Sequence, residues 1–195
     1  MTPPATIDAP AKTPAALPRL MTAEEHLRDH GDGRTELVRG RLEERSVPGV
    51  MHGETASRIN RRLGDWADEA GLTTLVEAGQ IVERGPDTVR LPDVSVVDKS
   101  LFPGGASPRG YSEVPFVLAV EVLSPDKSRG SLLPKVAEYA AAGTTLVWIV
   151  DPVKKTVEVF EDGRPAATYG DGDAIDGGDR LPEFRCEVRR FFGPA

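Results

Sequence analysis

The feature that most constrains this chain is an apolar run at residues 116–123 that contains one acid, Glu121. The run is too short for a typical helix and rich in β-branched residues, which favours a strand buried on both faces. Alternate side chains of a strand share a face, so Glu121 is expected to lie with Val117, Ala119 and Leu123. A carboxylate buried there costs on the order of several kcal/mol, or has a raised pKa, unless it is paired or binds a cation. The alternative is a strand-end glutamate bonded to an arginine or to backbone N–H groups.

Periodicity and capping signals predict the surrounding elements. Thr22 and Glu25 have the spacing of a capping box, which predicts a short helix that ends near Gly31. The apolar residues of 52–70 repeat every 3.6 positions and predict an amphipathic helix, and a second long helix is predicted over 131–142. A hairpin is predicted at residues 36–43, and further strands at 73–77, 80–84, 94–97, 145–150, 156–161 and 166–169.

The order strand, helix, strand between residues 116 and 150 is typical of a crossover unit. The two strands of such a unit are expected to be parallel neighbours. The predicted fold is therefore α/β (α+β mixed), with a mixed β-sheet flanked by helices.

Length and charge limit the class of protein. The 195 residues favour one domain, over 21–195, preceded by a disordered tail at 1–20 that contains five prolines. The net charge of −7 excludes a polybasic nucleic-acid coat but not an enzyme with a local basic groove. The single cysteine, Cys186, excludes an intramolecular disulfide and fits a cytoplasmic location. No apolar run approaches the roughly 20 residues that span a bilayer, so no membrane is expected as a partner.

Two further residues have the chemistry to act with Glu121. Asp93 opens the predicted strand at 94–97, and although a Pro-Asp pair alone is typical of turns, carboxylates on neighbouring strands provide the oxygen ligands that Mg²⁺ prefers. Lys135 flanks the apolar face of the second long helix beside Tyr139, from which it can reach over the sheet edge. The alternative for Lys135 is a solvated side chain, as for most helix lysines.

Seven segments in a fixed order carry a resemblance to a known family. They are Glu36–Leu42, His52, Pro92–Val97, Val120–Pro125, Lys135, Tyr139–Gly143 and Trp148–Pro152. In this order and spacing they resemble the Uma2 family, which comprises restriction-type endonucleases of the PD-(D/E)XK superfamily. The resemblance extends over roughly residues 21–192 and implies a restriction-endonuclease-like core.

The resemblance implies a metal-dependent phosphodiesterase. Asp93 and Glu121 match the acids that bind Mg²⁺, with Mn²⁺ as a substitute, and Val122 matches the residue that lends its backbone carbonyl. The superfamily lysine lies two residues after the glutamate, where this chain has Leu123. Lys135 matches the helix lysine that takes over in Uma2-like sequences.

Other residues match the family pattern less directly. Glu36 matches an N-terminal glutamate that contacts metal-bound water, with a plain hairpin side chain as the alternative. His52 opens the long helix, where packing at the helix end is favoured over a substrate contact. Asp151 is expected to form a turn. Ser131 stands where relatives often have an acid, and Pro134 is expected in the first turn of the second long helix, where its missing N–H has little cost.

The first functional hypothesis is a metal-dependent endonuclease that hydrolyses DNA. Asp93, Glu121 and the Val122 carbonyl hold the metal, while Lys135 orients the attacking water and stabilises charge on the phosphate. Cleavage of both strands favours a homodimer. The candidates for backbone contacts are Arg58, Arg61, Arg62, Lys127 and Arg129, with a solvated helix face as the alternative for the first three.

The second hypothesis is a non-catalytic nucleic-acid-binding or assembly module that retains the nuclease fold. The acidic composition and the missing strand lysine favour it, whereas the buried Glu121 argues against it. A metal-independent hydrolase is disfavoured because Ser124 is followed by proline and lacks a glycine-rich elbow.

Overall fold

The computed structural model describes residues 19–125 and 127–193, so nearly all of the tail predicted at 1–20 lies outside the described residues. The helices are α1 (Ala23–His30), α2 (Val50–Glu69) and α3 (Arg129–Ala141), with 3₁₀ turns η1 (Lys99–Leu101), η2 (Pro103–Gly105) and η3 (Val188–Phe191). The strands are β1 (Thr35–Val38), β2 (Arg41–Glu44), β3 (Thr73–Val76), β4 (Gln80–Glu83), β5 (Thr88–Arg90), β6 (Val94–Val97), β7 (Leu118–Val122), β8 (Leu146–Asp151), β9 (Thr156–Glu161), β10 (Arg164–Tyr169), β11 (Ala174–Asp176) and β12 (Arg185–Glu187).

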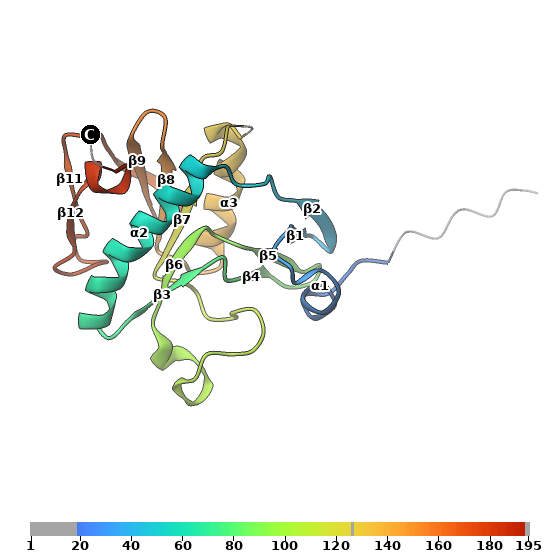
Figure 1. Ribbon diagram of the computed structural model, residues 1–195. Coiled ribbons are helices and arrows are strands. Elements are labelled where there is room, and N and C mark those ends of the chain that lie inside the picture. The colour runs from blue at the N-terminus through green and yellow to red at the C-terminus, as the bar shows by residue number, and fades with distance from the viewer. Residues whose placement is uncertain (1–18, 126, 194–195) are drawn as a thin grey trace, which may run out of the picture.

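A six-stranded mixed sheet forms the centre of the fold, in the order β10-β9-β8-β7-β6-β3 (Figure 1). Strands β7 and β8 are parallel and joined by α3, and Glu121 lies opposite Ile149 in their register. The other neighbouring pairs of this sheet are antiparallel. The predicted crossover unit and the predicted mixed α+β fold are therefore confirmed.

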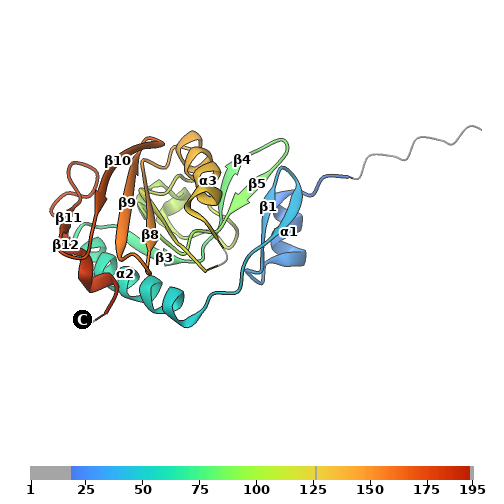
Figure 2. The ribbon, with the colours of Figure 1, turned by 90° about the horizontal axis from the view of Figure 1, so that it is seen from above.

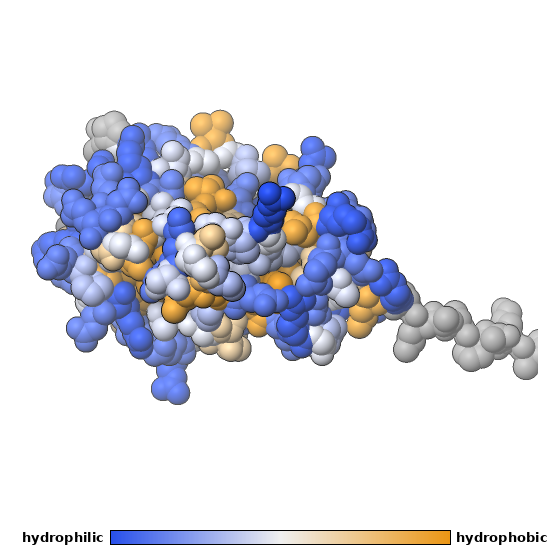
Figure 3. Space-filling view, turned by 90° about the horizontal axis from the view of Figure 1, so that it is seen from below, coloured by the Kyte–Doolittle hydropathy of each residue, from blue (hydrophilic) through white to orange (hydrophobic). Residues whose placement is uncertain are grey.

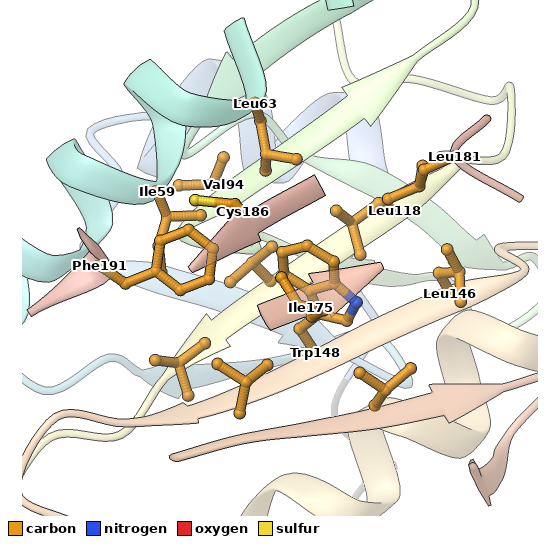
Figure 4. Close-up of a cluster of buried hydrophobic side chains, with 14 of the residues drawn as sticks. Ile59, Leu63, Val94, Leu118, Leu146, Trp148, Ile175, Leu181, Cys186 and Phe191 are labelled. Atoms are coloured by element: carbon orange, nitrogen blue, oxygen red, sulfur yellow. The ribbon is translucent and has the colours of Figure 1, made fainter. Parts of the chain in front are cut away.

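Helices cover both faces of this sheet (Figure 2). On one face, Ile59 and Leu63 of α2 pack with Trp148 of β8 and with Phe191 from the C-terminal segment (Figure 4). On the other face, α3 packs against β7, β8 and β9 through a smaller cluster: Ala119, Leu132, Val136, Tyr139, Val147, Ile149 and Phe160. Glu121 lies on the α3 face, because it alternates with the residues of β7 that face α2.

A second, four-stranded sheet lies beside the first, in the order β2-β1-β5-β4. It packs against α1 through a separate apolar cluster that includes Leu37, Val89 and Leu91. Only Leu91, Pro92 and Asp93 separate β5 of this sheet from β6 of the central sheet. The link brings the small sheet beside the start of β6, which pairs with β7 (Figure 1).

Several predicted boundaries differ from the structure. Helix α3 begins at Arg129, because the Ser128 side chain accepts a hydrogen bond from the backbone of Ser131 and caps it. Pro134 therefore lies in the second turn, and its predicted place in the first turn is wrong. Helix α2 begins two residues before His52. Strands β5, β11 and β12 were not predicted because each has only three residues, too few to show a periodicity.

Hydrophilic side chains cover much of the face seen from below in Figure 3. On the face seen in Figure 3, apolar side chains are scattered among hydrophilic ones, which is normal for a folded chain. Within residues 19–125 and 127–193, no helix is long and apolar enough to cross a membrane.

Candidate functional site

The pairing of β6 with β7 brings Asp93 next to Glu121. Val94 lies opposite Val120 in this antiparallel pair, and the Asp93 backbone N–H donates to the Val120 carbonyl at 3.0 Å. The backbone N–H of Val122 donates to Asp93 Oδ2 at 2.7 Å. The Asp93 carboxylate is thus fixed beside the backbone of β7, one residue from Glu121.

Glu121 is buried, with 5% of its surface exposed, and its partners come from α3. Lys135 Nζ donates to Oε1 and Oε2 of Glu121 at 3.1 and 3.0 Å, and the Tyr139 hydroxyl donates to Oε1 at 2.9 Å. Lys135 and Tyr139 are four residues apart, so both reach the sheet from one face of the helix. The alternatives for these residues, a glutamate bonded to arginine or backbone and a solvated lysine, do not occur.

Glu36 joins the same buried network from the small sheet. Its Oε1 accepts hydrogen bonds from Lys135 Nζ at 2.8 Å and from the Leu91 backbone at 3.0 Å. Its Oε2 accepts from Arg90 Nη1 at 2.8 Å, and Arg90 also contacts Glu138 of α3. Glu36 thus lies on the β1–β2 hairpin and is buried in this network. Arg90 is a member of the network that was not predicted from the sequence.

The charges of this network set the ionisation of its members. Burial alone would lower the pKa of Lys135, but Glu121 and Glu36 raise it, so the ammonium stays protonated. Burial would raise the pKa of Glu36, but Lys135 and Arg90 hold it well below its usual range. Burial raises the pKa of Glu121, Lys135 opposes this, and the negative charges of Asp93 and Glu36 add to the rise. The Lys135 ammonium thus forms ion pairs with two buried carboxylates, those of Glu36 and Glu121.

Two more side chains surround Asp93. His52, in the first turn of α2, places Nε2 3.2 Å from Asp93 Oδ2, and its hydrogen bond to Asp93 raises the pKa of the imidazole. Arg45, just after β2, places Nη2 3.5 Å from Asp93 Oδ1. His52 was expected mainly to pack at the helix end, and the contact with Asp93 was not predicted. No sequence feature indicated that Arg45 belongs to the site, because its place beside Asp93 depends on how the two sheets pack.

Several of these residues line one cavity of about 780 Å³ between the two sheets. Its wall includes Arg45, His52, Asp93, Glu121, Val122 and Lys135. The hydroxyls of Ser46 and Ser124 lie 3.1 Å apart and join the loop after β2 to the loop after β7. Lys127 also lines the cavity, as a candidate for contacts with a nucleic-acid backbone.

The remaining candidate residues lie elsewhere. Arg58 pairs with Glu54 on α2, and Arg129 pairs with Glu158. Asp151 accepts hydrogen bonds from the backbone N–H groups of Val153 and Lys154, which confirms its predicted role in a turn.

The donor set fits a hard divalent cation. Asp93 and Glu121, which carry the two carboxylates, line the cavity together with Val122. In the described part of the chain, no three His, Cys, Asp or Glu side chains cluster as a metal site. Mg²⁺ is commonly bound through one or two carboxylates, with waters and phosphate oxygens completing its shell. Two carboxylates beside an open cavity match that pattern.

Comparisons with known proteins identify the family and a shared fold. Residues 21–189 match the model of the Uma2 family, described as "Putative restriction endonuclease". No curated protein matches the sequence. The crystal structure of a "putative nuclease belonging to DUF820" from Anabaena variabilis superposes with a TM-score of 0.73 at 18% identity, over 88% of this chain and 97% of that one. This similarity shows a shared fold.

A second solved structure is far less similar. The cryo-EM structure of a DrdV–DNA complex gives a TM-score of 0.39 at 18% identity, over 69% of this chain and 11% of that one. A similarity of this size does not bear on the fold or on the function.

Proposed function

Because this chain belongs to the Uma2 family, we propose that it is a Mg²⁺-dependent endonuclease that hydrolyses phosphodiester bonds of DNA, with Mn²⁺ able to replace Mg²⁺. One observation carries the proposal: two acids from neighbouring strands, Asp93 and Glu121, line one cavity, and a buried lysine from α3 is bonded to the second. A network for stability alone would not need to face an open cavity.

The carboxylates of Asp93 and Glu121 and the backbone carbonyl of Val122 would hold the cation. When bound, a divalent cation polarises a phosphate and lowers the pKa of a water molecule. The contact between the Val122 N–H and Asp93 Oδ2 fixes the first carboxylate, and Lys135 and Tyr139 fix the second. Both ligands are therefore held in place before any substrate arrives, which is the preorganisation that such catalysis needs.

Lys135 would act through its charge and its hydrogen bonds. Glu36 and Glu121 raise the pKa of Lys135, which favours its protonated form and therefore the role of a donor. The ammonium can donate a hydrogen bond that orients the attacking water, and its charge opposes the negative charge that develops on the phosphate. Glu36 would position the ammonium, which it contacts at 2.8 Å.

Attack in line with the leaving 3′ oxygen would give a 5′-phosphate. Cleavage of both strands of a duplex would require two such sites, which a homodimer would supply.

The test is a cleavage assay on supercoiled plasmid, single-stranded DNA and RNA, with Mg²⁺, with Mn²⁺ and with EDTA. The key variant is Glu121→Gln, which keeps the side chain's shape while removing its charge. The matched control is Asp151→Asn, since Asp151 ends the neighbouring strand β8 but does not line the cavity. Far-UV circular dichroism and thermal unfolding check that both variants are folded.

We expect metal-dependent cleavage of DNA by the wild type and by Asp151→Asn, and its loss in Glu121→Gln. Cleavage that survives Glu121→Gln or EDTA would refute the proposed mechanism. DNA binding without cleavage of any substrate would instead support the non-catalytic binding module.

A further inference from the structure

Arg45 lies beside the proposed metal ligand Asp93, and the mechanism above does not use it. Arg45 lines the cavity, and 13% of its side chain is exposed. Two backbone carbonyls hold it: Nη1 donates to Gly33 at 2.8 Å, and Nη2 donates to Leu91 at 3.3 Å. These acceptors are neutral, so they fix the position of the guanidinium without cancelling its charge.

The charge of Arg45 is shared by two carboxylates. Asp93 Oδ1 lies 3.5 Å from Nη2, and Glu77 Oε1 lies 3.6 Å from Nη1. The Glu77 side chain is half exposed, so solvent screens this pair. A cation bound to Asp93 would neutralise the negative charge of that carboxylate. Arg45 would then hold a positive charge, at a fixed place in the cavity, with one weak partner.

We propose that Arg45 forms a phosphate-binding subsite that contacts a non-bridging oxygen of the nucleic-acid strand beside the cation. Guanidinium groups suit this role because their planar fork matches phosphate oxygens and their charge does not depend on pH. The proposal rests on the proposed nuclease function and adds a substrate contact to it. Arg45 and Lys127 both line the cavity, and the contact between Ser46 and Ser124 joins the loops that follow β2 and β7.

A purely structural role is the competing explanation. Arg45 joins the loop before β1 to the link between β5 and β6, so its removal could lower stability without affecting any ligand. The two explanations differ in one measurable quantity. A phosphate contact contributes to the salt dependence of nucleic-acid binding, and a structural contact does not.

The experiment measures binding of a short fluorescein-labelled DNA duplex, and of its single strand, by fluorescence anisotropy over a range of salt concentrations. Ca²⁺ replaces Mg²⁺, because it binds the same kind of oxygen ligands. A parallel series contains EDTA. The variants are Arg45→Ala, Arg45→Lys and the matched control Arg41→Ala, which removes the same charge from an exposed position on β2 outside the cavity. Thermal unfolding of each variant reports its stability separately.

We expect Arg45→Ala to weaken binding about tenfold and to reduce the salt slope by about 0.9 for duplex or about 0.7 for single-stranded DNA. Arg45→Lys, which keeps the charge but not the fork, should restore the slope and only part of the affinity. In EDTA no cation is bound to Asp93, so Asp93 still neutralises Arg45. The Arg45→Ala substitution should therefore weaken DNA binding less in EDTA than in Ca²⁺. Arg41→Ala should leave the slope nearly unchanged.

Two results would overturn the proposal in different ways. If Arg45→Ala unfolds at a lower temperature but binds with the same slope as Arg41→Ala, Arg45 has only a structural role and the nuclease proposal is unaffected. If the wild type neither binds nor cleaves nucleic acid, the nuclease proposal and the Arg45 subsite both fail.

Discussion

The buried charged side chains of this site stabilise one another's charged forms. Lys135 contacts Glu36 and Glu121, and Arg90 contacts Glu36 from its other side. Removing one member of a buried ion pair leaves the other uncompensated, which is usually far costlier than losing an exposed pair. The arrangement explains how this chain can lack a lysine at Leu123 and still hold an ammonium against Glu121.

The pH dependence of stability tests the charge of Glu36. Its pKa is lowered to about 2 in the folded chain, against burial, by Lys135 and Arg90. A lowered pKa stabilises the fold above the unfolded value, near 4.3, and this contribution is lost as the pH falls toward the folded value. We expect Glu36→Gln to lower the free energy of unfolding at neutral pH by about 3 kcal/mol. The difference from wild type should shrink as the pH falls from about 4.5 toward about 2.

Urea denaturation at a series of pH values measures this difference. Glu43→Gln is the control, because Glu43 also contacts Arg90 but its side chain is 59% exposed. Its difference from wild type should be small at every pH. A Glu36→Gln difference that does not change with pH would show that Glu36 contributes no charge to the network.

Site residues could be predicted from the sequence only where their residue type was unusual for the strand pattern around them. A glutamate within an apolar run and a Pro-Asp before a second run both stood out, and the structure places these two acids together. Arg45 and Arg90 did not stand out, because an arginine in a polar or half-polar segment is ordinary. Their importance comes from contacts with residues about 50 positions away in the chain.

At the scale of elements, local signals predicted the helices and most strands well. The capping box of α1 is present as predicted: Thr22 Oγ1 accepts from the Glu25 backbone, and Glu25 accepts from the Thr22 backbone. Boundaries set by less distinctive residues were displaced, as at α3, where Ser128 caps a helix that begins at Arg129, two residues before the predicted start. No local sequence pattern indicated the register between neighbouring strands.

The capping box makes a prediction about α1. Thr22→Ala removes the side-chain acceptor for the Glu25 N–H and should lower the free energy of unfolding by about 1 kcal/mol. Ser57→Ala is the matched control, because Ser57 is exposed in the middle of α2 and makes no cap. Thermal or urea unfolding compares the two variants. Equal stability of Thr22→Ala and Ser57→Ala would show that the cap contributes nothing.

At the scale of the whole molecule, the site exists because two sheets meet. Glu36 and Arg45 come from the small sheet and its loop, Asp93 from the link between the sheets, and Glu121 and Lys135 from the crossover unit of the large sheet. The sequence predicted the crossover unit but not the separation of the strands into different sheets, since pairing between distant strands depends on packing. The cavity could therefore not be predicted from local pattern.

The most direct measurement of the central claim is Mn²⁺ binding, followed by electron paramagnetic resonance, to the wild type, Glu121→Gln and Glu138→Gln. Glu138 is a suitable control, because it lies one residue before Tyr139 on α3, bonds Arg90 and does not line the cavity. We predict saturable binding of a single Mn²⁺ to the wild type and to Glu138→Gln, weakened tenfold or more, about 1.4 kcal/mol, in Glu121→Gln. Equal binding by all three proteins, or no saturable binding by the wild type, would contradict a metal site at Asp93 and Glu121.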